Sequence, residues 1–323
     1  MNPAGRKICV VIPYYQISAG PLVRAVSSIL EQRGVERPMV LIVDDASPLP
    51  ASPIIAGHFP DHHEFIRIIV QKNGGAANAR NTALDNLPEN TTYVAFLDSD
   101  DEWTPDHLAN AVRMLEGGCD FYFAGHKRTE WEKDKFAMIG FDPDKHECVE
   151  SGPGLYEYAG DFIFPVMDKH LVQTSSVVYR KDTLGNLRFP ENLVLGEDEV
   201  FWVQAMRASR KTGFCRHVEV RMGKGVNISQ GGEWGDERSI QLTAQNMRYW
   251  RQVAGLFPEE RQLETLRKLK LKELRRNLAT SVLHRLRRGK RLPLRHIAAG
   301  TSADPLWLVT LLTFPFNRNA GKS

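Results

Sequence analysis

The first 128 residues alternate short apolar runs with amphipathic segments, which is the pattern of an α/β fold with a mainly parallel sheet flanked by helices. The apolar runs predict strands over residues 8–15, 39–47, 65–71 and 92–101. The amphipathic segments predict helices over residues 21–32, 76–87 and 104–115. We expect Pro13 to close the first strand, and Thr104 and Pro105 to supply the N-cap and first turn of the last helix.

The alternation breaks down over residues 129–173, which are rich in Gly, Pro and aromatic residues and are expected to shape a pocket wall. A strand is predicted over residues 175–180, and a helix begins at or near Glu197. Within residues 229–239, three glycines surround Trp234. This composition predicts a mobile flap.

The C-terminal part of the chain is predicted to be helical and basic. Residues 261–292 carry apolar side chains at helical spacing among many cations, namely Leu271, Leu274, Leu278, Val282 and Leu286. The apolar run within residues 304–316 is too short to span a membrane and suits an interfacial segment. Two interpretations remain open: residues 260–316 bind an anionic membrane surface, or an amphipathic helix packs on the catalytic domain with its charged face in water.

Charge is divided unequally along the chain. Residues 256–323 contain 15 Lys and Arg against 5 Asp and Glu, whereas residues 1–255 contain 27 against 34. The basic part lacks interleaved aromatics and any nucleic-acid-binding motif, so we expect no nucleic-acid partner. The four cysteines are scattered without metal-ligand spacing, and no secretory leader is recognised. These features predict a cytoplasmic protein, with peripheral binding to the inner face of the cytoplasmic membrane as the alternative that the tail allows.

Acidic side chains follow two of the predicted strands. Asp44 and Asp45 end the second strand, and Asp98, Asp100 and Asp101 end the fourth. Both groups should meet at the carboxyl edge of a parallel sheet, where ligands bind. Carboxylates this close repel one another unless their pKa values rise or a cation binds, and Mg²⁺ or Mn²⁺ suits a few carboxylate oxygens that leave room for phosphate. The residues therefore predict a metal–diphosphate site, with a solvated acidic turn or a helix N-cap cluster as the alternatives.

Five segments occur in a characteristic order: "VVIPYY", "VDDAS", "NGGAANARN", "FLDSDDEW" and "LGEDEVFW". Together they resemble the family 2 glycosyltransferases of the GT-A fold, over about residues 6–230. The resemblance implies a catalytic domain over residues 1–235, with a nucleotide-binding half (1–128) and an acceptor-binding half (129–235). Residues 236–323 would form a basic helical extension.

The resemblance implies a donor site at the strand ends. Pro13 and Tyr15 would line the pocket for the base, and a tyrosine suits this role because it offers a flat face with a polar rim. Asp45 would accept the base N–H, while Asp44 hydrogen-bonds nearby backbone. Asn73 lies in the following loop of the donor site.

Arg80 would approach the base and phosphates, although a helix-surface ion pair is the alternative for this residue. Asp98 and Asp100 match the DxD motif, with Ser99 between them in the donor site. The resemblance implies that Asp100 binds a divalent metal, Mn²⁺ or Mg²⁺, and that Asp98 binds the metal or the ribose. Asp101 is the looser third acid.

Glu102 is expected to form the approach to the next helix. "GED" matches the catalytic-base motif, so Asp198 would take the proton from the acceptor hydroxyl and Glu197 would support it or touch the acceptor. Acids in the first turn of a helix are also stabilised by the helix dipole without any catalytic role. A single base implies a single displacement with inversion. Many relatives carry a histidine after the last core strand, where this chain has Lys224 as a substitute cation.

The implied activity is metal-assisted transfer from a nucleotide-sugar, a UDP-hexose or UDP-N-acetylhexosamine, to a hydroxyl of a glycan or lipid-linked saccharide. Its setting would be the synthesis of cell-surface polysaccharide or lipopolysaccharide. A nucleotidyltransferase would need a glycine-rich, lysine-bearing start that is missing. A non-catalytic nucleotide-sugar-binding protein would be expected to lose Asp198 or the DxD acids, and both are present.

Overall fold

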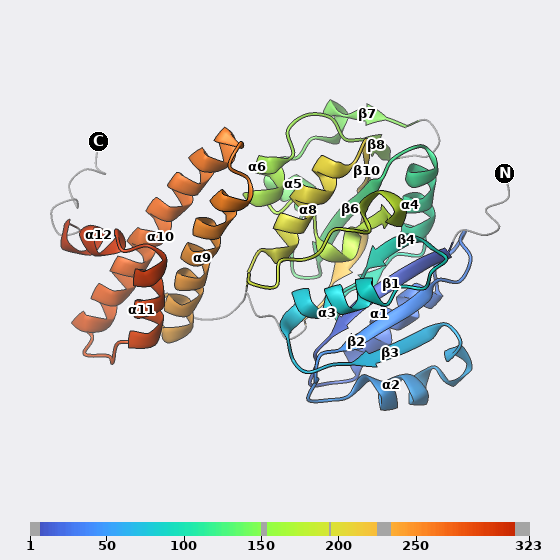
Figure 1. Ribbon diagram of the computed structural model, residues 1–323, viewed down its shortest axis with the longest axis horizontal. Coiled ribbons are helices and arrows are strands. Elements are labelled where there is room, and N and C mark those ends of the chain that lie inside the picture. The colour runs from blue at the N-terminus through green and yellow to red at the C-terminus, as the bar shows by residue number, and fades with distance from the viewer. Residues whose placement is uncertain (1–6, 150–153, 194, 225–233, 314–323) are drawn as a thin grey trace. The chain divides into compact units, whose positions relative to one another are not determined.

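The computed structural model describes residues 7–149, 154–193, 195–224 and 234–313. The chain divides into two compact units, drawn in Figure 1. The first comprises Met1–Glu191 and Glu197–Val226, and the second comprises Asn192–Gly196 and Asn227–Ser323. The chain therefore leaves the first unit for five residues and returns to it at Glu197.

A mixed sheet forms the centre of the first unit. Its strands are β1 (Lys7–Tyr14), β2 (Met39–Asp44), β3 (Ile66–Val70), β4 (Thr91–Phe96), β5 (Glu102–Trp103), β6 (Phe121–Arg128), β7 (Glu147–Cys148), β8 (Leu155–Glu157), β9 (Val178–Arg180) and β10 (Thr212–Met222). They are ordered β3-β2-β1-β4-β9-β6-β10-β8-β7, with β5 paired to β10. Strands β1 to β4 are mutually parallel, as are β6 and β10, whereas β9 is antiparallel to both β4 and β6.

Helices flank this sheet: α1 (Gly20–Leu30), α2 (Ala51–His58), α3 (Gly75–Asp85), α4 (His107–Glu116), α5 (Lys135–Ile139), α6 (Ile163–Met167), α7 (Lys181–Leu184) and α8 (Glu197–Ala208). Helix α3 packs on β1 and β2, and α4 packs on β6 and β10. The prediction of an α/β fold with a mainly parallel sheet and flanking helices is confirmed. The interiors of β1, β2 and β4 are almost fully buried, as expected for strands covered on both faces, whereas β3 at the edge of the sheet is only partly buried.

Several predicted boundaries were wrong. Pro13 does not close β1 but pairs with Val43 inside it. The ladder between β1 and β4 ends opposite Val11, so the missing N–H of Pro13 costs no bond on that side. Helix α4 starts at His107, later than predicted, with Asp106 as its N-cap. Glu102 does not lead into that helix; it forms β5 against β10.

An aromatic cluster fixes α8 against the end of β4. Phe201 and Trp202 of α8 contact Phe96 with ring centroids 6.2 and 5.7 Å apart. Phe189 stacks on Phe201 at 4.1 Å. All four rings are buried. Because α8 begins at Glu197, this cluster also determines where the first turn of α8 lies relative to the sheet edge.

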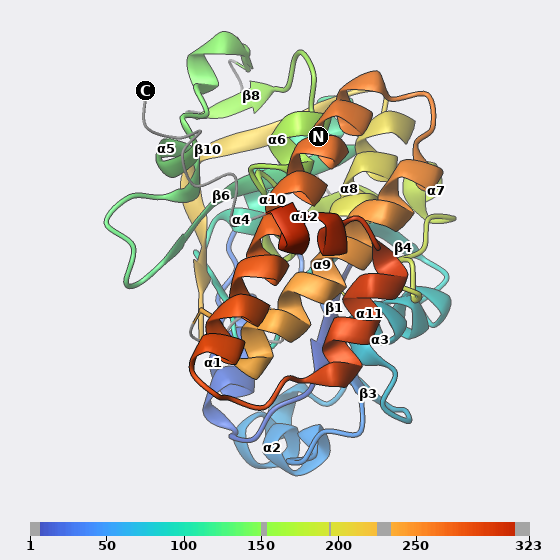
Figure 2. The same cartoon turned by 90° about the vertical axis from the view of Figure 1, so that its left-hand side faces the viewer.

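The second unit contains α9 (Glu237–Leu256), α10 (Arg261–Arg287), α11 (Leu294–Ala303) and α12 (Trp307–Thr313). Helix α9 packs on both α10 and α11, as Figure 2 shows, and α12 packs on α10. Asp304 is fully buried and accepts hydrogen bonds from Arg251 at 2.8 Å and Arg275 at 2.7 Å. Burial raises the pKa of Asp304, but the two guanidinium groups outweigh it and the net pKa is lowered. This ionic group joins three of the four helices.

The predicted amphipathic helix is α10, and its apolar side chains are partly as expected. Leu271, Leu278 and Val282 are buried, whereas Leu286 is exposed. No helix among the described residues is both long and apolar enough to cross a membrane. Residues 225–233, which include much of the predicted flap, and residues 314–316 of the apolar segment lie outside the described residues.

Candidate active site

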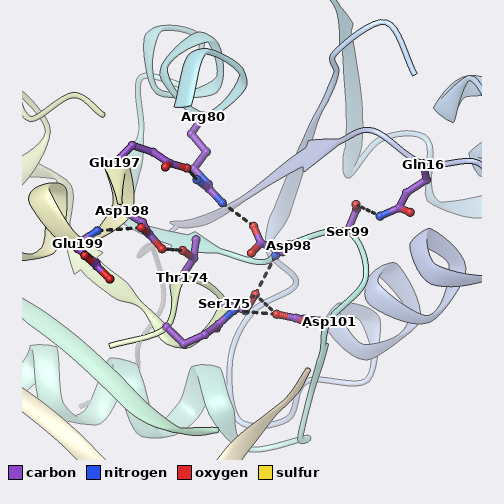
Figure 3. Close-up of polar contacts among 11 residues, drawn as sticks. Gln16, Arg80, Asp98, Ser99, Asp101, Thr174, Ser175, Glu197, Asp198 and Glu199 are labelled. Carbon is purple, nitrogen blue, oxygen red and sulfur yellow. Dashed lines mark hydrogen bonds and ion pairs between the residues drawn. The ribbon is translucent and has the colours of Figure 1, made fainter. Parts of the chain in front are cut away.

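The predicted site residues lie at the end of β1, in the loops after β1, β2, β3 and β4, and on α3 and α8. Figure 3 shows those on α3 and α8 and two of those after β4, namely Arg80, Asp98, Ser99, Glu197 and Asp198. The side chains of Arg80, Asp98 and Glu197 are in direct contact. Asp198 follows Glu197 in the first turn of α8. The acids after β4 and the acids of α8, about a hundred residues apart in the sequence, therefore meet at one edge of the sheet.

Asp45 connects the end of β2 to the start of α3. Its Oδ1 accepts the Gly74 N–H at 2.7 Å and the Gln71 amide at 2.8 Å, and its Oδ2 accepts the Gly75 N–H at 2.8 Å. The amide of Asn73 donates to the Asp45 carbonyl oxygen at 2.9 Å. A carboxylate at the N-terminus of a helix is favoured by the exposed N–H groups and the dipole. Asp45 therefore holds in place Asn73 and the glycine loop, by which we mean Gly74 and Gly75.

Asp44 has a structural role, as predicted. Its two carboxylate oxygens accept the backbone N–H groups of Ser47 and Ala51, both at 2.8 Å. The Ser47 hydroxyl in turn accepts the N–H of Gln16 and donates to its carbonyl oxygen. The loops after β1 and β2 are thereby joined.

Gln16 was not identified from the sequence, yet it links the β1 loop to the acids after β4. Its amide donates to the Ser99 hydroxyl at 3.0 Å, and both side chains are buried. Tyr15, next to Gln16, is 42% exposed. Pro13 is partly exposed at the end of β1. Thus Tyr15 offers a ring to solvent beside a loop that is held rigidly on both sides.

Arg80 is the central cation of the site. It lies on α3, is only 5% exposed, and its guanidinium packs over the ring of Phe189 at 5.3 Å. Its Nη2 donates to Asp98 at 2.8 Å and its Nη1 donates to Glu197 at 3.3 Å. Its Nε is buried without a hydrogen-bond partner among the described residues. The alternative of a helix-surface ion pair is therefore wrong, because Arg80 is buried between two acids.

Residues 98–101 form an acidic turn, closed by a hydrogen bond from the Asp101 N–H to the Asp98 carbonyl oxygen at 3.0 Å. Asp101 is buried and bonds to Ser175, Gln173 and the Gly223 N–H, at 2.7, 2.9 and 2.9 Å. Burial, with Asp98 and Asp100 nearby, raises the pKa of Asp101 to about 8. Asp101 therefore ties the acidic turn to the residue after β10 and to the segment before β9, a role unlike that of Asp98.

Ser175 and Gly223 complete the support of the acidic turn. The Ser175 hydroxyl accepts the N–H of Asp98 at 2.9 Å in addition to its bond with Asp101. A Cβ atom at Gly223 would lie 1.7 Å from the carbonyl oxygen of Asp100, so only glycine fits. The acidic turn is thus held from two sides by backbone and hydroxyl contacts.

The two acids of α8 are partly buried, and their pKa values are raised. Burial raises the pKa of Glu197 to about 7, with Asp198 adding to the effect and Arg80 opposing it. Burial, followed by the charge of Glu199, raises the pKa of Asp198. Asp198 accepts the Glu199 N–H at 2.9 Å and the Thr174 hydroxyl at 3.4 Å. These contacts orient a carboxylate whose affinity for a proton is higher than that of an ordinary aspartate.

His170 and Thr174 were missed by the sequence reasoning. His170 contacts Glu199 through Nδ1, and this hydrogen bond raises the pKa of the imidazole. Its backbone has φ of 51°, which is uncommon for a residue other than glycine. An unusual backbone conformation beside candidate catalytic acids is the signal that only the structure provides.

The acids after β4 carry carboxylate oxygens, which are the ligands that Mg²⁺ and Mn²⁺ prefer. Within the part of the chain that the structure describes, no group of three or more His, Cys, Asp or Glu residues is placed to hold a metal ion. Mg²⁺ in nucleotide sites is commonly held by one or two carboxylates together with substrate phosphates. Asp98 and Asp100 fit such a donor set, although one oxygen of Asp98 is already bonded to Arg80. Lys224 is exposed just after β10, and the residues that follow it lie outside the described part.

Comparison with known proteins finds a matching family model and a similar bacterial protein. The family model described as glycosyl transferase family 2 matches residues 9–164. The succinoglycan biosynthesis protein ExoW of Rhizobium meliloti is 35% identical over 249 residues, which are 76% of each protein.

Two solved structures are similar to this chain at low sequence identity. The S. aureus TarS fragment 1–349 in complex with UDP-GlcNAc superposes with a TM-score of 0.58 at 16% identity, covering 94% of this chain and 81% of that one. The mannosyltransferase PcManGT of Pyrobaculum calidifontis, in complex with GDP-Man and Mn²⁺, gives 0.57 at 16% identity, covering 96% and 84%. At this identity the likeness concerns the fold.

Proposed function

The chain belongs to glycosyl transferase family 2 and has the GT-A fold, and we propose that it moves a sugar from a UDP-sugar to a saccharide hydroxyl in the synthesis of a cell-surface polysaccharide. One observation carries the proposal. Buried Arg80 joins Asp98, on the donor side, to Glu197, which adjoins the candidate base Asp198. Donor and acceptor chemistry therefore share one connected group of side chains.

The donor is a UDP-hexose or UDP-N-acetylhexosamine. TarS, a neighbour in fold, was solved with UDP-GlcNAc, and ExoW is named for succinoglycan biosynthesis. The exposed ring of Tyr15 and the adjoining Pro13 cover the base. Asp45 uses three of the roughly four acceptor positions of a carboxylate for Gln71 and the glycine loop, and the base N–H takes the remaining position on Oδ2.

Asp98, Ser99 and Asp100 face the ribose and diphosphate, together with Arg80. Asp100 and Asp98 would hold Mn²⁺ or Mg²⁺, which when bound neutralises charge that develops on the diphosphate. Arg80 lies beside Asp98 already and contributes a fixed positive charge to the same region. Because the acidic turn is held by Ser175 and Gly223, these carboxylates keep their positions when the donor arrives.

Asp198 is the catalytic base. The acceptor hydroxyl oxygen attacks the anomeric carbon, the bond from that carbon to the diphosphate oxygen breaks, and the hydroxyl proton passes to the Asp198 carboxylate. The raised pKa of Asp198 brings its proton affinity toward working pH. One base opposite the leaving group gives a single displacement with inversion. Glu197 orients the acceptor or supports Asp198 through Arg80.

A thermal-shift series tests the donor proposal. UDP-, GDP- and dTDP-sugars are added with and without Mn²⁺ to the wild type and to Asp100→Asn. We expect a UDP-sugar to raise the melting temperature more with Mn²⁺ than without, and Asp100→Asn to lose the metal-dependent part. Stabilisation by none of these sugars would reject the proposal. Two other results favour the alternatives. A non-catalytic binding protein would bind the nucleotide-sugar without transferring the sugar. A nucleotidyltransferase would release pyrophosphate from UTP plus a sugar phosphate.

We also propose that the second unit binds an anionic membrane surface on the cytoplasmic side. Exposed apolar side chains gather in and just before α12, namely Leu306, Leu308, Val309 and Leu312. On α10, the exposed cations Lys268, Lys272 and Arg276 are four residues apart and share one helix face. Each cation near an anionic surface contributes about 1 kcal/mol. Buried Leu271, Leu278 and Val282 are used for packing within the unit and do not take part.

Vesicle sedimentation tests the membrane proposal. Vesicles of phosphatidylglycerol with phosphatidylcholine should pellet the wild type, and vesicles of phosphatidylcholine alone should pellet much less. Charge reversal of the three α10 cations should abolish the difference, whereas reversal of Arg113, an exposed cation on α4 of the first unit, should not. Equal sedimentation with both vesicle types would reject the proposal.

A further inference from the structure

A cavity of about 210 Å³ lies within the second unit and is separate from the acids of the candidate active site. Its walls come from Asn192, Leu193 and Leu195 of the segment between the two parts of the first unit, from α9 and from α11. The contributing residues on α9 include Gln241, Gln245, Arg248 and Gln252, which follow one another at spacings of four, three and four. This spacing places all four polar side chains on one face of the helix.

The chemistry of the lining favours a polyhydroxylated ligand. The Oε1 atom of Gln245 is buried and has no hydrogen-bond partner among the described residues. A buried acceptor without a partner is unfavourable, and a ligand hydroxyl that donates to it removes the cost. The guanidinium of Arg248 and the other amides supply donors for ligand oxygens. Of the described residues that line the cavity, none is acidic, although Glu237 lies 3.5 Å from the lining residue His296.

The volume limits the ligand to a small group. Pockets for drug-sized ligands measure about 300–1,000 Å³, so this cavity takes something smaller. Leu193 and Leu195 of the segment and Ala244 of α9 add apolar wall to the polar face. A sugar ring combines these demands, because it has an apolar face and a rim of hydroxyls. An inorganic anion would use Arg248 but would leave the amide row and the apolar wall without a partner.

The position of the segment in the chain relates the cavity to catalysis. Leu195 is only three residues before Asp198, so the extended chain between them spans at most about 11 Å. Gly196 has φ of 74°, and a Cβ there would lie 2.3 Å from the Tyr249 ring of α9. The segment is therefore seated closely on α9 before it continues into Glu197. Leu195, which lines the cavity, is therefore close along the chain to the candidate base.

We propose that this cavity binds one sugar ring of the acceptor saccharide, with Gln245 accepting from a hydroxyl and Arg248 donating to a ring or hydroxyl oxygen. The inference rests on the proposed transferase function, since it assigns the ligand to the acceptor of that reaction. It adds a recognition site in the second unit, apart from the first unit that contains the sheet. Selectivity for the acceptor would then depend on α9 and α11 as well as on the loops of the first unit.

Saturation-transfer NMR with simple methyl glycosides tests the proposal. The probes are the methyl glycosides of glucose, galactose, mannose and N-acetylglucosamine. We expect at least one to bind the wild type, and Ala299→Phe, which places a ring at the cavity wall, to bind it about tenfold more weakly or not at all. Ala298→Phe is the matched control, because Ala298 is exposed on the same helix and does not line the cavity. Should Ala299→Phe fold poorly, Gln245→Met at nearly equal volume provides the same comparison with Gln262→Met as its control.

The outcomes separate this inference from the function on which it rests. UDP binding, followed by thermal shift in the same samples, reports on the donor site alone. Two results would overturn the cavity proposal while UDP binding leaves the transferase proposal standing. In the first, no glycoside binds the wild type. In the second, Ala299→Phe and Gln245→Met bind the glycoside as well as their controls do. If neither UDP nor any other nucleotide tested binds while a glycoside is lost from Ala299→Phe, the donor proposal fails and the cavity remains a saccharide site.

Discussion

Replacing Glu197 by Gln should make the protein more stable at pH 8, even though the change removes a charge that faces Arg80. Burial raises the pKa of Glu197 from 4.5 to about 7, so the folded protein holds this carboxyl proton more tightly than the unfolded chain does. A carboxyl whose pKa is raised on folding favours the folded state less and less as pH rises from 4.5 to 7. By pH 8 the ionised carboxylate lowers the free energy of unfolding by about 3 kcal/mol.

The glutamine avoids this cost but weakens the hydrogen bond from Arg80 at 3.3 Å, which contributes about 1 kcal/mol. Glu197→Gln should therefore be more stable than the wild type by about 2 kcal/mol at pH 8 and equal or slightly less stable at pH 4.5. Urea unfolding at both pH values, followed by tryptophan fluorescence, measures this difference. Glu102→Gln is the control, because its surface ion pair with Arg24 contributes at most about 1 kcal/mol.

A difference between Glu197→Gln and the wild type that does not change with pH would refute the reasoning, because the raised pKa would then have no part in stability. A variant less stable at pH 8 than at pH 4.5, relative to the wild type, would show that Arg80 and Glu197 form a net stabilising pair. Either result would remove the argument that this acid is held under electrostatic strain beside the candidate base.

Three further predictions concern the support and the titration of the site. Gly223→Ala should abolish donor binding in the thermal-shift assay, because its Cβ would lie 1.7 Å from the Asp100 carbonyl oxygen. The control Gly57→Ala, with open space around its Cβ, should bind donor normally, and equal donor binding by the two variants would contradict this prediction. Ser175→Ala should lower the free energy of unfolding by about 1–3 kcal/mol, measured in urea, because it removes the hydroxyl that accepts the Asp98 N–H and one of the three bonds to the Asp101 side chain; an unchanged midpoint would mean that the contact is dispensable. The rate of sugar transfer should rise with pH through a midpoint above the ordinary aspartate range of about 4, since burial raises the pKa of Asp198; a rate independent of pH from 4.5 to 8.5 would exclude this base.

The first half of the fold could be predicted from the sequence because its strands are long and continuously apolar. Strands β1, β2 and β4 each bury both faces, β3 is a short apolar strand at the edge of the sheet, and the helices between them have clear amphipathic spacing or capping signals. Strand β9 was recognised as a strand, but its antiparallel place between β4 and β6 was not, since three residues carry no directional signal. The assignment of the five residues Asn192–Gly196 to the second unit could likewise not be predicted, because their partners lie on helices far along the chain.

The acids of the site could be predicted by type and place, but not the contacts that give them separate roles. That Arg80 would be buried between Asp98 and Glu197 depends on where the fold places α3, the acidic turn and α8, which no local pattern encodes. Gln16, Thr174 and Ser175 carry no sequence signature, because amides and hydroxyls occur throughout the surface of any protein. Their roles emerge only when the loops that carry them are brought together.

The most direct test of the account is the rate of transfer by Asp198→Asn, measured under single-turnover conditions with the UDP-sugar that stabilises the protein most and a saccharide extract as acceptor. The account predicts a rate lower by about 10²–10⁴-fold, with the affinity for UDP unchanged, because the base is removed while the donor site is left intact. An Asp198→Asn variant that transfers sugar at the wild-type rate would contradict it.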